Sequence, residues 1–394
     1  MSSWPLVALS DVFEIARGGS PRPIDDYVTD DPDGINWIMI GDATEGTKYI
    51  TGTTRRIRTE GAQRSRAVKP GDFLLTNSMS FGKPYILRTS GCIHDGWLVL
   101  SPRRRDVDAD FFYHLLGSDA VYAEFERRAS GATVKNLNID LVKGVKVPLP
   151  PLPEQRRLAK ILDMADELRA KRRAALAQLA PLTQSIFLDM FGDPATNPKG
   201  WSVTPLACLV RGDDNINYGV VQPGDDVEEG VPLIRVGDLV GGKVRRSGLK
   251  RIASSIEAAY KRSRLRGDEI LVSCVGSIGV VALADQLVKG FNIARAVARI
   301  PLAETTNRLF VVAYLNTDYV QRYFINELRT VSQPTLNIKQ LSETLVVLPP
   351  IEMQLEFARR ASALAKLESA HCDALTELDA FFASLQHRAF RGEL

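Results

Sequence analysis

Basic side chains gather in two stretches of this 394-residue sequence, and phosphate binding is the chemistry they could perform. The first stretch contains Arg55, Arg56, Arg58, Arg64 and Arg66, and the second contains Lys243, Arg245, Arg246, Lys250, Arg251, Arg262 and Arg264. Such side chains bind phosphate oxygens, and arginine also contacts the guanine edge through two hydrogen bonds. The stretches occupy equivalent places in the two halves of the chain. We therefore predict contact with DNA, with a merely solvated basic surface as the alternative.

Polar, glycine-rich segments offer a second set of hydrogen-bonding groups. The candidates are Asn77, Ser78, Ser80, Lys83, Lys135 and Asn136 in the first half and Ser273, Ser277, Gln333 and Thr335 in the second. Side chains of these types at loop tips can bind base edges or phosphates. They are also ordinary turn residues, so a purely structural role stays open for each.

Other chemistry is poorly supported. The four histidines have no catalytic or zinc-binding spacing. Residues 237–243 match the G-x-x-x-x-G-K phosphate loop, but Val244 stands where Ser or Thr would bind magnesium. We find neither G-x-S-x-G nor the Asn/Asp-Pro-Pro-aromatic motif of amino-methyltransferases. We expect a binding protein without catalytic residues or a metal. A nuclease with an unrecognised site is one alternative.

An internal repeat determines where these segments lie. Residues 37–42 (WIMIGD) resemble residues 233–238 (LIRVGD), 196 positions later. Residues 149–152 (LPPL) resemble residues 348–351 (LPPI), at an offset of 199. Because further matches keep the same order, the chain is two copies of one unit.

Each copy begins with short apolar runs separated by Gly, Pro, Asn and Asp, a pattern typical of strands. One helical stretch is expected near the end of each such part, at residues 109–128 and 307–328. We predict an α+β protein with two similar mixed α/β domains, residues 1–150 and 193–349. Residues 151–192 and 350–394 form the helices that follow them.

These two helices are unusually long. The first is expected from Pro153 to about Met190, kinked at Pro181, and the second from about Glu352 to Phe390. Both carry an apolar stripe with the three- and four-residue steps of a coiled coil. Its members are Leu158, Leu162, Ala165, Leu168, Arg172, Leu176 and Leu179 in the first helix and Phe357, Ala361, Leu364, Leu367, His371, Leu375 and Leu378 in the second.

The connectivity favours an antiparallel pair of helices that separates the two domains, with a pseudo-two-fold axis across the pair. Packing of each helix on its own domain alone is the alternative. Arg172 and His371 interrupt the stripes at equivalent positions, 199 residues apart. We predict that they face each other, since a polar interruption can set the register of a seam. Extension of both side chains into solvent is the alternative.

Composition restricts the class of protein. The net charge is only +3, so positive charge is local. The four cysteines are scattered, which suits a reducing compartment. We find no apolar run of the roughly 18 residues that a membrane span needs, and no signal peptide. We expect a cytoplasmic protein with no membrane partner.

The chain resembles the DNA-specificity (S) subunits of type I restriction–modification systems. The resemblance rests on the two domains with their long helices and on residues 68–73 (VKPGDF), 131–139 and 149–155 (LPPLPEQ). The second-half counterpart, residues 348–354 (LPPIEMQ), lacks the third proline and has Met in place of Glu.

The resemblance implies a non-catalytic subunit that binds a bipartite duplex target, two different half-sites with a constant spacer. It also implies two methyltransferase (M) subunits held by the helices, and restriction (R) subunits. S-adenosylmethionine, ATP and Mg²⁺ would bind to those partners, with no cofactor in this chain. A coiled-coil interaction scaffold without a DNA role is the rival interpretation.

Overall fold

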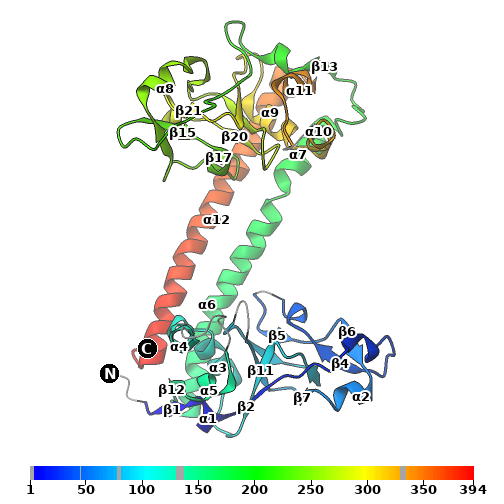
Figure 1. The fold of residues 1–394 in the computed structure, drawn as a ribbon, viewed down its shortest axis with the longest axis vertical. Coiled ribbons are helices and arrows are strands. Elements are labelled where there is room, and N and C mark those ends of the chain that lie inside the picture. Colours follow the sequence, from blue (N-terminus) through cyan, green and yellow to red (C-terminus); the bar gives the residue numbers. More distant parts are fainter. Residues whose placement is uncertain (1–3, 45, 78–80, 130–136, 329–333) are drawn as a thin grey trace. The chain divides into compact units, whose positions relative to one another are not determined.

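The computed structural model describes residues 4–44, 46–77, 81–129, 137–328 and 334–394. The chain forms two compact units: unit 1 is Met1–Ala175 with His371–Leu394, and unit 2 is Leu176–Ala370. Each unit combines an α+β globule with parts of the long helices (Figure 1). The prediction of two mixed α+β domains with long helices is confirmed, whereas the predicted domain boundaries remain predictions.

Unit 1 is built on two five-stranded sheets, with strand orders β3-β6-β4-β10-β7 and β2-β11-β8-β9-β5. The strands of the first are β3 (Val28–Thr29), β4 (Ile35–Ile38), β6 (Arg55–Ile57), β7 (Arg66–Val68) and β10 (Gly91–Ile93). Those of the second are β2 (Phe13–Arg17), β5 (Tyr49–Ile50), β8 (Phe73–Thr76), β9 (Pro84–Leu87) and β11 (Trp97–Pro102). One apolar core contains residues of both sheets, including Ile38, Ile93, Leu74 and Trp97.

The short helices of unit 1 are α1 (Leu9–Val12), α2 (Thr59–Ala62), α3 (Ala109–Leu116), α4 (Asp119–Ala129) and α5 (Ile139–Lys143). All of these except α2 share a second apolar core with β2, β8 and β11. A short pair, β1 (Leu6–Ala8) with β12 (Lys146–Pro148), joins the start of the chain to the segment that precedes the first long helix.

Unit 2 repeats this plan with a six-stranded sheet, β14-β22-β19-β20-β17-β16, and a three-stranded sheet, β18-β15-β21. Its strands are β13 (Ser202–Pro205), β14 (Asn217–Tyr218), β15 (Val231–Ile234), β16 (Leu239–Val240), β17 (Lys243–Val244), β18 (Lys250–Ile252), β19 (Ile270–Ser273), β20 (Val281–Leu283), β21 (Asn292–Ile293), β22 (Val297–Ile300) and β23 (Leu345–Leu348). Its short helices are α8 (Ser254–Ala258), α9 (Arg308–Leu315), α10 (Asp318–Asn326) and α11 (Ile338–Glu343).

The repeat extends to strand register. Trp37 of β4 pairs with Cys92 of β10 in parallel, and Leu233 of β15 pairs with Asn292 of β21 in the same way. The offset between the copies changes near Asp72. The carboxylate of Asp72 accepts a hydrogen bond from the N–H of Lys69, and that of Glu269 accepts one from the N–H of Arg266. Asp72 therefore corresponds to Glu269, 197 positions later, although Asp268 lies at the offset of 196 found for residues 37–42.

Each predicted helical stretch of the globules is two helices, α3–α4 and α9–α10. The break has the same cause in both units. The hydroxyls of Ser118 and Thr317 accept hydrogen bonds from the N–H groups of Val121 and Val320, and thereby start a new helix.

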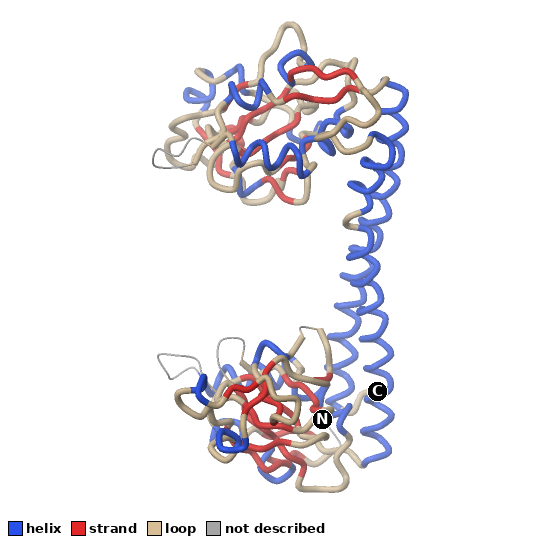
Figure 2. Tube along the Cα trace, turned by 90° about the vertical axis from the view of Figure 1, so that its right-hand side faces the viewer, coloured by secondary structure: helices blue, strands red, loops and turns tan. Residues whose placement is uncertain are grey.

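The long helices are α6 (Leu152–Leu179), α7 (Leu182–Phe191) and α12 (Ile351–Arg391). The first helix is interrupted at Pro181, as predicted, because proline lacks a donor N–H. In unit 1, α6 and α12 lie side by side (Figure 2). Arg169 binds Asp379 and Arg172 contacts His371, so the residue numbers run in opposite directions and the two segments are antiparallel, as predicted.

One buried glutamine ties each long helix to its globule. The Gln155 carboxamide donates to the carbonyls of Asp106 and Pro150 and accepts from the N–H of Asp108, the N-cap of α3. Gln354 accepts from the N–H of Asn307, the N-cap of α9, and donates to the carbonyl of Pro349. This explains why Gln recurs at an offset of 199.

Two glycines let the entering chain pass against a sheet. A Cβ on Gly18 would lie 2.1 Å from the carbonyl oxygen of His94, and one on Gly219 would lie 1.6 Å from that of Ile293. The next residues, Gly19 and Val220, donate to the carbonyls of Ile93 and Ile293. Only glycine permits this approach without a backbone shift.

We predict that Gly219→Ala destabilises unit 2 by about 2–3 kcal/mol, because the added methyl group displaces the backbone beside β21. Thermal unfolding of the full chain measures this loss. Gly212→Ala is the matched control, since a Cβ there meets nothing within 4 Å. Equal midpoints for the two variants would contradict the prediction.

Candidate nucleic-acid interface

In unit 1, backbone hydrogen bonds bring four separate segments to one edge of the globule. The N–H of His94, just after β10, donates to Ile38 at the end of β4 (3.1 Å). The N–H of Asn77 donates to Gly96 (3.0 Å), and that of Leu137 donates to Asn77 (2.8 Å). We call this the loop edge of unit 1: residues 38–42, 77, 81–83, 94–96 and 137.

Unit 2 has the same edge, made by the same bonds. Ala294 donates to Ile234 (2.9 Å), Cys274 to Ala296 (2.8 Å) and Leu336 to Cys274 (2.9 Å). The loop edge of unit 2 comprises residues 234–238, 274–280, 294–296 and 336. Residues 38–42 and Asn77 of unit 1, separate in sequence, thus lie at one edge, as do residues 234–238 and 274–280 of unit 2.

Strand direction divides the first basic stretch. Arg66 pairs with Ile93 and Arg55 pairs with Trp37, so both lie beside the loop edge. Arg56 donates to the carbonyl of Pro32 before β4, at the opposite end of the sheet. The backbone N–H of Arg58 donates to the carbonyl of Tyr27, away from the edge.

Arg64 is engaged with a side chain of its own globule. Its guanidinium lies 5.4 Å from the Tyr27 ring centroid and donates to the Tyr27 hydroxyl (2.6 Å). Arg56 and Arg64 thus have partners within their own globule. Their contact with DNA, and that of Arg58, stays a prediction.

The second basic stretch divides similarly. Arg245 donates to the buried carboxylate of Asp238 (2.9 Å) on the loop edge, and the exposed Arg246 follows it. Lys250 pairs with Leu233, one residue before the end of β15, and its Nζ donates to the Gly224 carbonyl (2.5 Å).

Other members of this stretch lie farther from the edge. Lys243 pairs with Leu283 at the far end of β20, and Arg251 pairs with Pro232. Arg262 is exposed beside the N-terminal part of β14. Arg264 forms two hydrogen bonds with Glu257 (2.7 and 2.5 Å), and its contact with DNA stays a prediction.

The structure also separates the polar loop residues. Asn77 is 1% exposed and its amide donates to the Asp95 carbonyl (2.8 Å). Ser273 is fully buried, and its hydroxyl accepts from the N–H of Val280 to close the loop. These two side chains hold the loop ends inside the unit, which is the structural role that the sequence left open for them.

The remaining polar candidates are distributed as follows. Ser277 is exposed at the loop tip, and Thr335 forms a β-bridge with Val275. Lys83 is exposed after the first loop. Ser78, Ser80, Lys135, Asn136 and Gln333 lie outside the described residues.

Sequence inspection missed a polar group around Asp95 on the loop edge of unit 1. Arg17 donates to the Asp95 carbonyl (3.1 Å), Ser20 donates to its carboxylate (2.9 Å), and Arg22 lies 3.5 Å from it. Burial raises the pKa of Asp95, but the Ser20 hydrogen bond and the neighbouring His94 outweigh burial, so its pKa is lowered overall. The signal available in the sequence was Gly18-Gly19, which marks a close approach of the chain.

A second polar cluster joins the globule of unit 1 to its long helices. Lys48 binds Asp110 (2.6 Å) and Asp163 of α6 (2.8 Å), and Asp163 also binds His114 of α3 (2.6 Å). Burial lowers the pKa of Lys48, but both carboxylates raise it above the usual value. Burial raises the pKa of Asp163, while His114 and Lys48 lower it by more.

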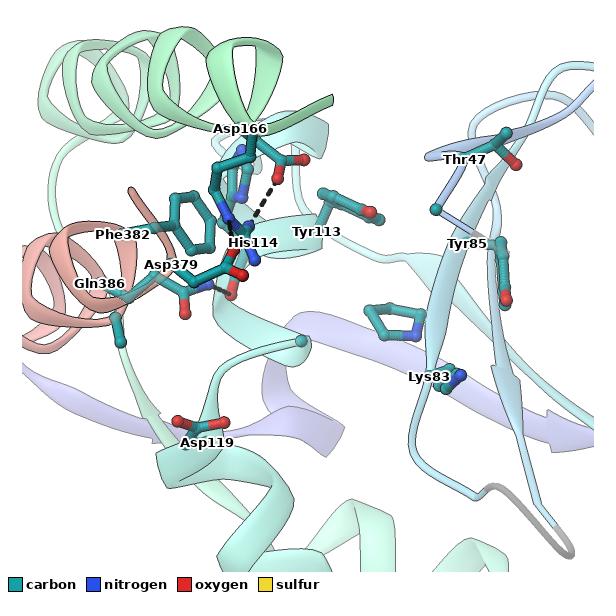
Figure 3. A pocket seen from close by; sticks show the side chains of 15 residues that line it. Thr47, Lys83, Tyr85, Tyr113, His114, Asp119, Asp166, Asp379, Phe382 and Gln386 are labelled. Atoms are coloured by element: carbon teal, nitrogen blue, oxygen red, sulfur yellow. Dashed lines mark hydrogen bonds and ion pairs between the residues drawn. The ribbon is translucent and has the colours of Figure 1, made fainter. Parts of the chain in front are cut away.

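Beside this cluster is a pocket of about 470 Å³. Figure 3 shows His114 from α3, Asp166 from α6, and Asp379, Phe382 and Gln386 from α12 around it. Gln386 donates to the backbone carbonyl of His114 (3.3 Å), so α12 also contacts the globule here. Unit 2 has Ala313 and Ser362 at the equivalents of His114 and Asp163, so the cluster is particular to unit 1.

The predicted helix stripe is buried only in part. Leu158, Leu162, Ala165, Leu179 and Phe357 are buried, whereas Ala361, Leu364, Leu375, Leu378 and Leu176 are half-buried. Leu168 and Leu367, at equivalent positions, are 54% and 45% exposed, so their predicted burial in a seam is wrong. Arg172 Nη1 lies 3.0 Å from His371 Nδ1, the pairing that the repeat predicted.

Comparison with known proteins identifies the family. The family model described as the type I restriction modification DNA specificity domain matches residues 1–178 and 215–377. The chain belongs to this family. None of its described helices is long and apolar enough to cross a membrane.

Two relatives from Escherichia coli are similar to this specificity-domain chain along its whole length. The specificity subunit of type I restriction enzyme EcoBI is 29% identical, covering 100% of this chain and 86% of the relative. The specificity subunit of EcoKI, from strain K12, is 22% identical, covering 99% of this chain and 89% of the relative.

Solved structures share the fold. A chain from work on complex assembly and conformational transition of the type I R-M system has a TM-score of 0.64 at 18% identity, covering 99% of this chain and 98% of that chain. The type I restriction–modification S subunit from M. genitalium has a TM-score of 0.55 at 15% identity, covering 99% and 96%.

We predict that Asp163→Asn lowers the stability of unit 1 by about 1–2 kcal/mol at neutral pH, because two charge-assisted hydrogen bonds are lost at a partly exposed site. The lowered pKa of Asp163 makes its contribution complete above the unfolded pKa, near 4, and lost as pH falls through the folded pKa. Urea unfolding between pH 3 and 7 measures this. A variant with the same acid-side slope as the wild type would contradict the assignment.

We predict that replacing both Arg172 and His371 with leucine stabilises unit 1 by about 1 kcal/mol, since a polar interruption of an apolar helix pair lowers stability. Thermal unfolding measures this, with Lys171→Leu, an exposed neighbour, as the control. A double variant less stable than the wild type would show that the Arg–His contact stabilises the pair.

Proposed function

We propose that this chain is the DNA-recognition subunit of a type I restriction–modification complex and has no catalytic activity of its own. It binds a bipartite duplex target in which each unit contacts one half-site and the spacer is not contacted. The observation that carries this proposal is the loop edge. Both units build it with the same three backbone hydrogen bonds, yet present different side chains on it.

Two of the differences lie on the loop edge itself. Met39 in unit 1 corresponds to Arg235 in unit 2, and Asp95 corresponds to the exposed Arg295. A common backbone with unlike side chains supports two unlike half-sites, because base edges are distinguished by the donors and acceptors that meet them. Arg55 and Arg66 beside one edge and Lys250 and Arg246 beside the other supply positive charge for phosphate contacts.

The long helices offer a surface for the methyltransferase subunits. In unit 1, Met164, Leu168 and Phe381 are 60%, 54% and 55% exposed on α6 and α12. In unit 2, Leu355 and Leu367 are 54% and 45% exposed on α12. Exposed apolar strips of this kind are typical of protein interfaces. Two M subunits would cover the two strips, and R subunits would join the complex.

The cofactors belong to those partners. S-adenosylmethionine on the M subunits would serve methylation, and ATP with Mg²⁺ on the R subunits would serve cleavage. This chain would select the DNA sequence at which they act. We place the complex in the cytoplasm, where its DNA substrate is found.

We predict that deletion of the gene removes one methylated adenine motif from the host genome, with two unlike half-sites around a constant spacer. Single-molecule sequencing of the genome with and without the gene measures this. Re-expression of the wild-type chain is the control and should restore the motif. An unchanged methylation map, together with no methyltransferase co-purifying with the chain, would support the scaffold interpretation instead.

A further inference from the structure

A pair of arginines surrounds a buried carboxylate on the loop edge of unit 2. Asp238 is fully buried. One of its oxygens accepts from the backbone N–H of Arg235 (2.9 Å) and from Arg235 Nε (3.1 Å), and the other accepts from Arg245 Nη2 (2.9 Å). The side chains of Arg235 and Arg245 remain 47% and 51% exposed. We call these three residues the arginine clamp.

The repeat shows which part of this arrangement the fold requires. Asp42 occupies the equivalent place in unit 1 and accepts from the N–H of Met39 (2.8 Å), as Asp238 does from Arg235. Its other oxygen accepts from the N–H and hydroxyl of Thr54, both at 2.9 Å. The frame therefore needs the aspartate and its backbone bond. The backbone frame does not require the two arginine side chains.

The carboxylate keeps the arginines in one orientation. Burial raises the pKa of Asp238, but the hydrogen bonds from Arg235 and Arg245 lower it by more. The net pKa lies below the usual value, so the carboxylate is charged at neutral pH. Because Arg235 is bound through Nε, the two N–H groups at the end of its guanidinium, one on Nη1 and one on Nη2, point away from Nε and are not used by the carboxylate. Among the described residues, Nη2 has only a long contact with the Gly248 carbonyl (3.5 Å) and Nη1 has no hydrogen bond.

A guanidinium oriented in this way suits a base edge better than a phosphate. Phosphate attracts any nearby cation, and the exposed Arg246 could serve that purpose without a carboxylate partner. Guanine presents two acceptors, O6 and N7, that match the paired N–H groups of one arginine. Holding the planar group in advance reduces the entropy lost in forming both bonds.

We propose that the arginine clamp recognises guanine in the half-site of unit 2, with Arg235 donating from Nη1 and Nη2 to O6 and N7, and Arg245 with Asp238 positioning it. This inference rests on the proposed function, since it assumes that the loop edge contacts DNA. Arg235 was absent from the basic stretch singled out in the sequence, because its neighbours in the chain are apolar or acidic.

The test is a binding selection with a random duplex library. The full-length chain, in complex with the methyltransferase subunits that co-purify with it, selects DNA that is then sequenced. The variants are Arg235→Ala and Arg235→Lys, and Arg246→Ala is the matched control, with thermal unfolding of each to show that unit 2 is folded.

We expect the DNA that the wild-type chain selects to carry an invariant guanine in one half-site. Arg235→Ala should reduce the preference for that guanine by about 10- to 100-fold and leave the other half-site unchanged. Arg235→Lys should lose the preference too, because lysine keeps the charge without the paired donors. Arg246→Ala should weaken binding to all sequences and reduce the salt slope by about one.

The outcomes separate the two proposals. If the wild type selects a two-part motif and Arg235→Ala keeps its guanine preference, the clamp proposal is overturned and the proposed function stands. If Arg235→Ala, like Arg246→Ala, weakens binding to every sequence equally, the clamp contacts phosphate and the proposal is likewise overturned. If the wild type selects no motif, both proposals fail together.

Discussion

A buried carboxamide at the start of each long helix is the contact on which the arrangement of each unit depends. Gln155 and Gln354 are 0% and 1% exposed, and each joins the proline-rich entry of a long helix to the N-cap residue of the helix pair in its globule. A buried amide left without partners is costly, so each globule and its helix can meet in only one way. The loop edge of each unit is positioned relative to its long helix in part through this contact, and in unit 1 the ion pairs of Asp163 add a second one.

The repeat, the long helices and the interruption at Pro181 could be predicted from the sequence, because each depends on local chemistry or on a period along the chain. The contact between Arg172 and His371 could also be predicted, since a two-fold repeat on antiparallel helices relates equivalent positions. The division of the helical stretches at Ser118 and Thr317 was missed, although both residues are good N-caps. Here a local signal was present inside an apolar pattern that indicated one continuous helix.

The candidate site was harder to predict, because it depends on which end of a strand each residue occupies. Arg55 and Arg56 are adjacent in sequence, yet one lies beside the loop edge and the other reaches the opposite end of its sheet. Asn77 and Ser273 have the polarity of contact residues but are turned inward to close their loops. Arg17 and Arg235 were overlooked because spatial neighbours on the edge come from distant segments. Charge clustering along a sequence is a poor guide to clustering on a surface.

The exposed apolar strips on the helices affect how the chain behaves before any partner arrives. Met164 and Leu168 are one helical turn apart on α6, and Phe381 lines the same groove as Leu168. While uncovered, such a surface lowers solubility and favours self-association. The chain should be most abundant in soluble form when it is synthesised together with a partner that covers these residues, so the supply of that partner would set how much specificity subunit a cell can maintain.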